Sequence, residues 1–330
     1  MPVNSRRRHH LRKQRLQKAR SIKAKQAQKS RVPPKIIARN PLDIYNLGSE
    51  LSSTVEPETN CIITTYNELK NPELIITRYV YKTTPTTLKS LASDYNKLYT
   101  RLLATQEPLY KTICCNDNYE PAGFVVSKKP QSAGALCSYS ETTYMQGQQI
   151  GKEDQGGQDE DSLYLEKSDN SLIIKRLTGE GDKNPGNAFR AIYSEIKLTK
   201  KAAAAATAVA PEVVYTRIVS DANLMPVGYI VMERIMGKYL SETEVRTNAD
   251  EIHRLIDILY DNGITHNDLH NRNILKGYTE SEQEPRIWII DYGSALIGKP
   301  PIEKSKREYR IAITFEGGNT HRSYKTFITV

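Results

Sequence analysis

The sequence has few cysteines and no long hydrophobic run, and both features limit what the protein can be. Its four cysteines, Cys61, Cys114, Cys115 and Cys137, form no C-x-x-C pair and lack zinc-site spacing. This pattern predicts reduced thiols in the cytoplasm or nucleus, although four cysteines also suffice for two disulfides. The longest run of small apolar residues, 202–210, has nine residues and is too short to span a bilayer. The start of the chain shows no charged-then-apolar signal peptide, so we expect no membrane span.

Acidic residues are absent from the first 42 positions, which contain 14 of the 47 lysines and arginines. The rest of the chain therefore carries 33 basic and 38 acidic residues, a formal charge of −5. Residues 1–40 are predicted to be a basic disordered arm because they contain too few apolar residues to fold alone. Residues 5–39 suit nucleic acid or another polyanion, which they would bind with release of counterions. A nuclear import signal, binding to an anionic surface and a leader without a specific partner remain open.

Residues 41–145 contain no recognisable catalytic motif, and we expect an N-terminal α/β extension of unknown role. Two β-branched and aromatic runs, 61–66 and 74–81, predict strands. A helix is predicted by apolar residues at steps of three and four, namely Leu88, Leu91, Tyr95, Leu98 and Leu102.

The densest group of chemically useful side chains lies in residues 264–293. His266, Asp268 and Asn273 fall within eight residues, and the apolar run RIWII then delivers Asp291. Carboxylate and amide oxygens are the hard ligands that hold Mg²⁺, which in turn bridges phosphate oxygens. The alternative is a solvated turn whose polar groups bond the local backbone.

These motifs, HNDLHNRNIL followed by IIDYG, resemble the H-x-D-L-x-x-x-N and D-F-G signatures of protein-kinase-like phosphotransferases. The resemblance implies ATP and Mg²⁺ as cofactors. It implies that Asp268 orients the acceptor hydroxyl as a base and that Asn273 and Asp291 hold the metal. His266 would pack beneath the metal loop.

A lysine and a glutamate far upstream extend the resemblance. Lys175 ends the predicted strand SLIIK, and Glu195 lies 20 residues later on a helix predicted over 187–206. The resemblance implies that Lys175 pairs with the α- and β-phosphates of ATP and that Glu195 holds Lys175. A lysine and a glutamate on adjacent surface elements are ordinary, but the 93 residues between Lys175 and Asp268 also match the family interval.

Two further segments complete the implied nucleotide site. Residues 228–237, GYIVMERIMG, predict a buried strand that enters a hinge, where the resemblance places adenine against the backbone of Glu233, Arg234 and Ile235. A core strand with a polar exit is the alternative. Residues 146–160 occupy the place of the phosphate-covering loop and include Gly151, but they lack the G-x-G-x-x-G spacing. A plain surface loop is the alternative there.

Three departures from the family narrow the choice of branch. His270 stands where protein kinases usually have lysine, and Asn267 replaces an arginine that binds activation-loop phosphate. Only 39 residues follow Asp291, without an A-P-E motif. The chain thus resembles minimal atypical kinases of the RIO-like, lipopolysaccharide-kinase-like or choline-kinase-like branches, and kinase-like proteins of large DNA viruses.

We expect an α+β chain with a bilobal protein-kinase-like fold, a truncated C-terminal lobe and an N-terminal extension. The boundaries are an arm at 1–40, the extension at 41–145, a small lobe at 146–235 and a large lobe at 236–330. The expected function is ATP- and Mg²⁺-dependent phosphoryl transfer to Ser/Thr of a protein substrate. One alternative is an inert kinase-like scaffold, such as a viral structural protein, that binds nucleic acid through its arm. Another is a small-alcohol kinase. Location in a virion would follow if the chain is viral.

Overall fold

The computed structural model describes residues 47–68, 71, 73–81, 86–106, 108–116, 118–128, 146–149, 163–166, 170–179, 183–297, 310–315 and 324–329. The arm, including residues 5–39, and Gly151 lie outside the described residues. The fold is mixed α+β, with a large antiparallel sheet and few helices, as the sequence predicts at this level.

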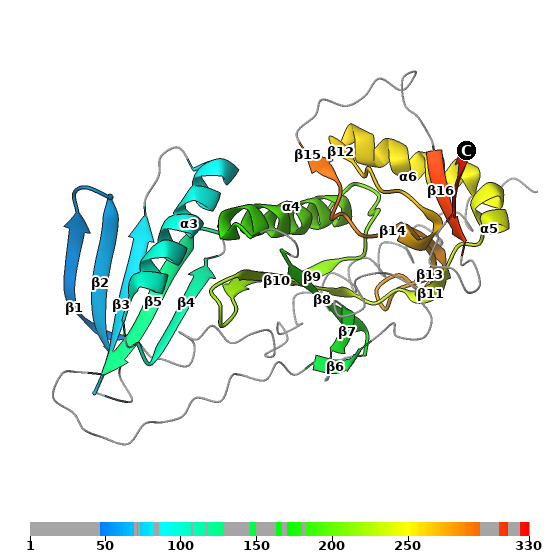
Figure 1. Ribbon diagram of the computed structural model, residues 1–330. Coiled ribbons are helices and arrows are strands. Elements are labelled where there is room, and N and C mark those ends of the chain that lie inside the picture. The colour runs from blue at the N-terminus through cyan, green and yellow to red at the C-terminus, as the bar shows by residue number, and fades with distance from the viewer. Residues whose placement is uncertain are drawn as a thin grey trace, which may run out of the picture. The chain divides into compact units, whose positions relative to one another are not determined.

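One sheet of ten strands runs through the described part of the chain in the order β1-β2-β3-β5-β4-β9-β10-β8-β7-β6 (Figure 1). The strands are β1 (Leu47–Glu56), β2 (Cys61–Glu68), β3 (Leu74–Tyr81), β4 (Tyr110–Cys115), β5 (Pro121–Lys128), β6 (Gln146–Gln149), β7 (Leu163–Glu166), β8 (Leu172–Thr178), β9 (Val213–Ser220) and β10 (Pro226–Glu233). The predicted strands at 61–66, 74–81 and 228–237 are confirmed as β2, β3 and β10, although the last ends at Glu233.

Successive side chains of the central strands β8 and β10 point to opposite faces of the sheet, and each face packs against its own apolar cluster. Strand β8 pairs with β7 on one side and β10 on the other, and Lys175 stands opposite Ile230. Residues on β10 are buried along its whole length, because helices cover one face and an apolar cluster lies on the other. Lys175 is therefore held on a strand that is fixed from both sides.

The sequence patterns did not indicate five of these strands, β1, β4, β5, β6 and β9, and β6 lies within the segment 146–160 that was expected to be a loop. Strand β5 begins with Pro121 and contains Gly123, two residue types that are depleted in strands. A Cβ atom at Gly123 would lie 2.7 Å from Cδ1 of Leu102, so the helix can approach this strand only where the side chain is absent. Tertiary packing thus overrides the local preference.

Two helices lie over the same face of the sheet, α3 (Leu88–Ala104) and α4 (Pro185–Ala203). The predicted stripe on α3 is confirmed: Leu91, Tyr95, Leu98 and Leu102 are buried, and Leu88 is half-buried. Helix α4 begins two residues before its predicted start, with Asn184 as N-cap and Pro185 in its first turn.

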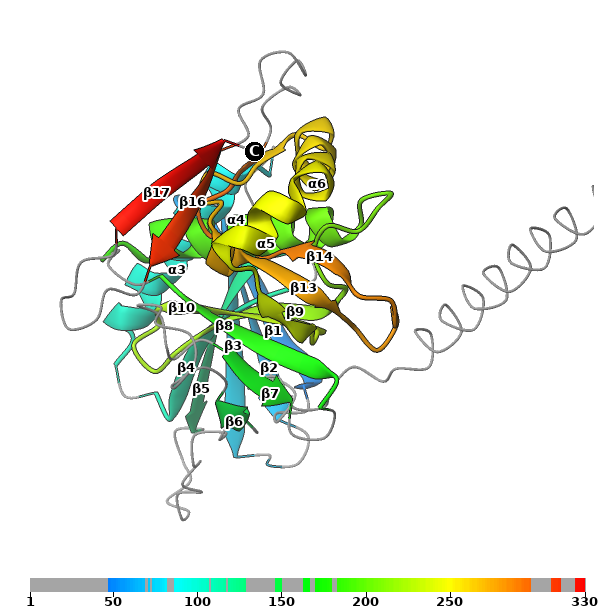
Figure 2. The same ribbon diagram turned by 90° about the vertical axis from the view of Figure 1, so that its right-hand side faces the viewer.

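The chain then forms a second group of elements around its own apolar core (Figure 2). These are β11 (Met236–Tyr239), α5 (Glu242–Thr247), α6 (Ala249–Asp261), β12 (Ile264–Thr265), the 3₁₀ turn η1 (Asn271–Asn273), β13 (Ile274–Tyr278), β14 (Arg286–Ile289) and β15 (Leu296–Ile297). Strands β11, β13 and β14 form one antiparallel sheet, and β12 pairs with β15. Near the C-terminus, β16 (Arg310–Phe315) and β17 (Tyr324–Thr329) pair as an antiparallel hairpin.

The described residues also bear on the earlier expectations about cysteines and membranes. Within the described part of the chain, Cys61, Cys114 and Cys115 form no disulfide with one another, while Cys137 lies outside it. Across the described segments, none of the helices has the length and apolar character needed to cross a bilayer.

Candidate functional site

The site is built around an ion pair between the sheet and a helix. Lys175 projects from the middle of β8, and its Nζ lies 2.6 Å from Oε1 of Glu195 on α4. The two side chains are only 17% and 13% exposed. Because both charges are largely removed from water, the pair depends on its geometry much more than a surface pair does.

Asp291 joins this pair from a distant part of the chain. Its Oδ1 accepts a hydrogen bond from Nζ of Lys175 at 2.9 Å, so one ammonium group bridges two carboxylates. Asp291 follows β14 with a φ of 65°, a left-handed conformation that aspartate tolerates better than most residues. Gly293 leaves room for the arrangement, because a Cβ atom there would lie 3.2 Å from Oε2 of Glu195.

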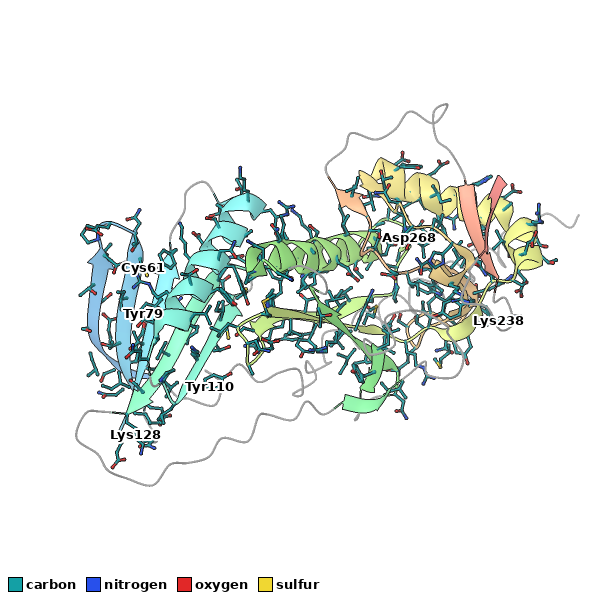
Figure 3. All side chains as sticks on the ribbon, viewed as in Figure 1. Cys61, Tyr79, Tyr110, Lys128, Lys238 and Asp268 are labelled. Atoms are coloured by element: carbon teal, nitrogen blue, oxygen red, sulfur yellow. The ribbon has the colours of Figure 1, made fainter. Side chains whose placement is uncertain are left out.

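The loop that carries Asp268 begins where α6 ends. Helix α6 buries its apolar face, after which β12 leads directly to His266. The Asp268 side chain is 42% exposed and accepts no hydrogen bond from the described residues. The ring of His270 lies beside it, with Nε2 3.7 Å from Oδ2. Asp268 is therefore available to a ligand, and Figure 3 labels it among the elements of the second group.

Strand pairing brings Asn273 next to Asp291. Ile274 on β13 is opposite Ile289 on β14, and the amide of Ile290 donates to the carbonyl of Asn273 at 3.0 Å. Nδ2 of Asn273 in turn donates to the carbonyl of Asp268 at 2.9 Å. One hairpin therefore fixes all three predicted residues of the metal and acceptor site in one place.

Two side chains beside Asp268 hold the backbone on both sides of Asp291. Nε2 of the buried His266 lies 2.9 Å from the carbonyl oxygen of Ile290, and Nδ2 of Asn267 donates to the carbonyl of Ser294 at 3.2 Å. His266 also packs against the ring of Tyr292, with ring centroids 5.1 Å apart. Asn267 thus bonds directly to the loop that follows Asp291.

The pKa shifts at the site follow from burial and from these contacts. Burial lowers the pKa of His266, which favours the neutral ring with Nε2–H donating to Ile290. Burial acts to raise the pKa of Asp291, but the Lys175 ammonium and the Gly293 amide bring it below its usual value. Burial also opposes the charge on Lys175, yet Glu195 and Asp291 together raise the pKa of its ammonium above the usual value. At neutral pH, His266 is therefore uncharged, Asp291 is ionised and Lys175 is protonated.

The donor set fits a magnesium ion that is shared with phosphate. Because Nδ2 of Asn273 is used by Asp268, its amide oxygen is the atom left to face a cation. Asp291 uses only Oδ1 toward Lys175 and Gly293, which leaves Oδ2 without a partner among the described residues. Mg²⁺ commonly takes one or two carboxylates and completes its shell with water and phosphate oxygens. Within the described residues no three His, Cys, Asp or Glu side chains gather closely enough to form a metal site by themselves.

The hinge residues differ in what they can offer to a ligand. The amide of Glu233 donates to the carbonyl of Glu212, and the amide of Arg234 donates to that of Ser171. Neither amide is therefore open to adenine. The Ile235 amide makes no such bond within the described residues, so it is the hinge donor that a nucleotide could reach.

The sequence patterns did not indicate Tyr239 on β11 as part of this region. Burial, followed by the charge of Asp291, raises the pKa of its hydroxyl, and Arg272 and Lys175 act on it in the opposite sense. Pairing of β11 with β13 places Tyr239 close enough to Asp291 and Lys175 to feel their charges, and no motif marks that pairing in the sequence.

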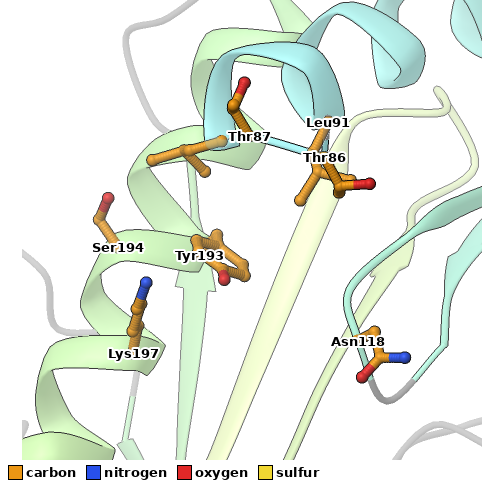
Figure 4. A pocket seen from close by; sticks show the side chains of 8 residues that line it. Thr86, Thr87, Leu91, Asn118, Tyr193, Ser194 and Lys197 are labelled. Carbon is orange, nitrogen blue, oxygen red and sulfur yellow. The ribbon is translucent and has the colours of Figure 1, made fainter. Parts of the chain in front are cut away.

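A cavity of about 480 Å³ lies at a different place, between the start of α3 and the outer face of α4 (Figure 4). Tyr193, Ser194 and Lys197 line it. At about 100° per residue these three share one side of α4, and Glu195 projects from roughly the opposite side. The cavity is therefore separate from the Lys175 site.

Comparison with known proteins gives no assignment: no protein-family model matches the chain, and no curated protein sequence does either.

Proposed function

We propose that the chain is an ATP- and Mg²⁺-dependent phosphotransferase with a bilobal protein-kinase-like fold and a short C-terminal lobe. The observation that carries the proposal is the bridge formed by Lys175 between Glu195 and Asp291, at 2.6 and 2.9 Å. In protein kinases a lysine on the third strand must pair with a helix glutamate while the D-F-G aspartate is in place. Lys175 is on β8, the third strand counted from β6.

The proposed roles follow from what each side chain can contact. Lys175 would bind the α- and β-phosphates, and Glu195 would keep its ammonium in position. Asn273 and Asp291 would hold Mg²⁺, which neutralises charge on the phosphates when bound. The Ile235 amide would bind adenine at the hinge. These contacts position the γ-phosphoryl group, which is most of what catalysis of this reaction requires.

Asp268 would act on the acceptor. Its exposed carboxylate would accept a hydrogen bond from the attacking hydroxyl and take its proton. The acceptor oxygen would form a bond to the γ-phosphorus while the bond from that phosphorus to the β–γ bridging oxygen breaks, so ADP leaves. We favour Ser/Thr of a protein as acceptor, since the basic arm suits large anionic assemblies. A small alcohol is the competing acceptor, because HND and His270 resemble choline-kinase-like enzymes.

Transfer of labelled phosphate from ATP tests the proposal. The acceptors would be a library of Ser/Thr peptides and a set of small alcohols, each with Mg²⁺. Asp268→Asn should lower kcat by about 10²-fold or more while ATP still binds. Asp250→Asn makes the same chemical change at an exposed position on α6 and should leave the rate unaltered. Transfer that survives in Asp268→Asn would refute the role of this residue.

The segregation of charge supports a second function, binding of nucleic acid through residues 5–39. Its expected signature is affinity that falls steeply with salt, because each phosphate contact releases counterions. A variant that lacks residues 1–40 should lose this binding and keep Mg–ATP binding. An inert scaffold would bind nucleic acid through residues 5–39 and would transfer no phosphoryl group.

A further inference from the structure

Residues 47–128 contact the helix that carries Glu195 at several successive turns. We refer to this segment, which comprises β1–β5 and α3, as the N-terminal module. Its first contact is Asn96 on α3, whose Oδ1 accepts from the amide of Gly186 at 2.7 Å. Nδ2 of the same side chain donates to Oδ1 of Asn184, the N-cap of α4, at 3.0 Å. Asn96 thus satisfies a first-turn amide that the helix itself cannot satisfy.

Aromatic contacts continue along the same side of α4. The rings of Tyr95 and Phe189 stack at 5.3 Å, and both residues are fully buried. One turn further, the ring of Tyr119 meets Tyr193 edge-on at 5.0 Å. Gly186, Phe189 and Tyr193 follow one another at helical spacing, so the module contacts one continuous stripe of the helix.

The closeness of the two helices depends on a missing side chain. A Cβ atom at Gly186 would lie 2.4 Å from the carbonyl oxygen of Ala92 and 2.5 Å from Nδ2 of Asn96. Alanine at this position would favour the helix by its own propensity. The glycine is therefore explained by contact with α3, which an added methyl group would push away.

The module is also joined to the sheet that carries Lys175. Cys114 on β4 pairs with Val219 on β9, and the amide of Ile113 donates to Oγ of Ser220 at 2.9 Å. Strand β9 pairs with β10, and β10 pairs with β8. The N-terminal module thus contacts both the helix that carries Glu195 and the sheet that carries Lys175.

We infer that the N-terminal module is a built-in positioning device for Glu195, and that Asn96 is its principal positioning residue. The module sets where α4 lies over the sheet and so sets the 2.6 Å contact between Lys175 and Glu195. The effect of this positioning on catalysis rests on the proposed function. This role assigns a task to the extension, which supplies from within the chain the helix placement that the site needs.

Three variants of the full chain test the inference. Asn96→Ala removes both contacts with α4, and Asn96→Asp keeps an acceptor for the Gly186 amide. Thr100→Ala is the matched control, because the Thr100 hydroxyl bonds only the carbonyl of Asn96 within α3. The coupling between Lys175 and Glu195, measured by a double-mutant cycle in each background, should shrink in Asn96→Ala, shrink less in Asn96→Asp and stay unchanged in the control. Amide hydrogen exchange along α4 should be fastest in Asn96→Ala, intermediate in Asn96→Asp and unchanged in Thr100→Ala.

Enzyme kinetics add the readout that connects the device to activity. We expect kcat to fall about tenfold in Asn96→Ala, which corresponds to about 1.4 kcal/mol, and not in Thr100→Ala. A Lys175–Glu195 coupling as strong in Asn96→Ala as in the wild type would overturn the inference. If the wild type binds no Mg–ATP, the proposed function fails, but coupling and exchange still decide the positioning role because neither requires a nucleotide.

Discussion

Nζ of Lys175 donates to Oδ1 of Asp291 at 2.9 Å, although 116 residues separate the two in the sequence. This contact closes the site between the sheet and the loop after β14. With Glu195 on the other side of the ammonium, the three side chains carry a formal charge of −1. A bound cation next to Asp291 would be stabilised by this excess negative charge, whereas phosphate would contact Lys175 directly.

The ion pair between Lys175 and Glu195 should be energetically coupled. Combining Lys175→Met with Glu195→Gln in a double-mutant cycle should give about 1–3 kcal/mol of coupling in urea unfolding. The pair of Arg246 and Glu242 is the control, since its atoms are 2.8 Å apart but its side chains are 58% and 35% exposed. That exposed pair should give about 0.5 kcal/mol or less. Equal values for the two pairs would show that burial adds nothing.

His266 should make the stability of the fold depend on pH. Burial lowers the pKa of its ring below the value of about 6.5 expected in the unfolded chain. Below that pH the unfolded chain binds the proton more readily, so the free energy of unfolding should fall as pH decreases from about 7. His266→Gln cannot titrate, and its difference from the wild type should change between pH 7.5 and 5.5. A constant difference across this range would contradict the argument.

The sequence predicted the parts of the fold that depend on local pattern. Helix α3 and strands β2, β3 and β10 were predicted from periodicity or from runs of apolar residues, and they are present. The joining of β4 to β9 rests mainly on a single residue pair and one serine hydroxyl, so no local pattern could indicate it. The candidate site was accessible because Lys175, Asp268 and Asp291 stand in recognisable motifs. The hydrogen bond of Asn267 and the position of Tyr239 depend on tertiary pairing, so the sequence could not indicate them.

The hairpin between β13 and β14 should stabilise the hinge. Oγ of Ser281 donates to Oε2 of Glu233 at 2.6 Å, and Glu233 is only 1% exposed. Ser281→Ala should therefore lower the free energy of unfolding by about 1–3 kcal/mol. Ser294→Ala is a useful control for the same chemical change, because only the backbone carbonyl of Ser294 is used in the site. An unfolding free energy equal to that of the wild type in Ser281→Ala would exclude this contribution.

Tyr292 follows Asp291 directly, and its hydroxyl has a hydrogen-bond partner. The side chain is buried, and Oη donates to the carbonyl of Ile289 at 3.2 Å. Tyr292→Phe should cost about 1 kcal/mol in urea unfolding, the net value of one hydrogen bond. Binding of Mg–ATP should not change, because the buried hydroxyl bonds the carbonyl of Ile289 on β14. A large loss of binding would give Tyr292 a role in the site that its contacts do not indicate.

The most direct test of the account is the unfolding free energy with and without Mg–ATP, for the wild type and for the Lys175→Ala, Asp291→Ala double variant. A ligand that binds only the native state at a hundred times its Kd stabilises the fold by about 2.7 kcal/mol. We expect stabilisation of that order in the wild type, only when Mg²⁺ is present, and none in the double variant. No stabilisation at millimolar ATP, or the same stabilisation in both proteins, would contradict the proposed nucleotide site.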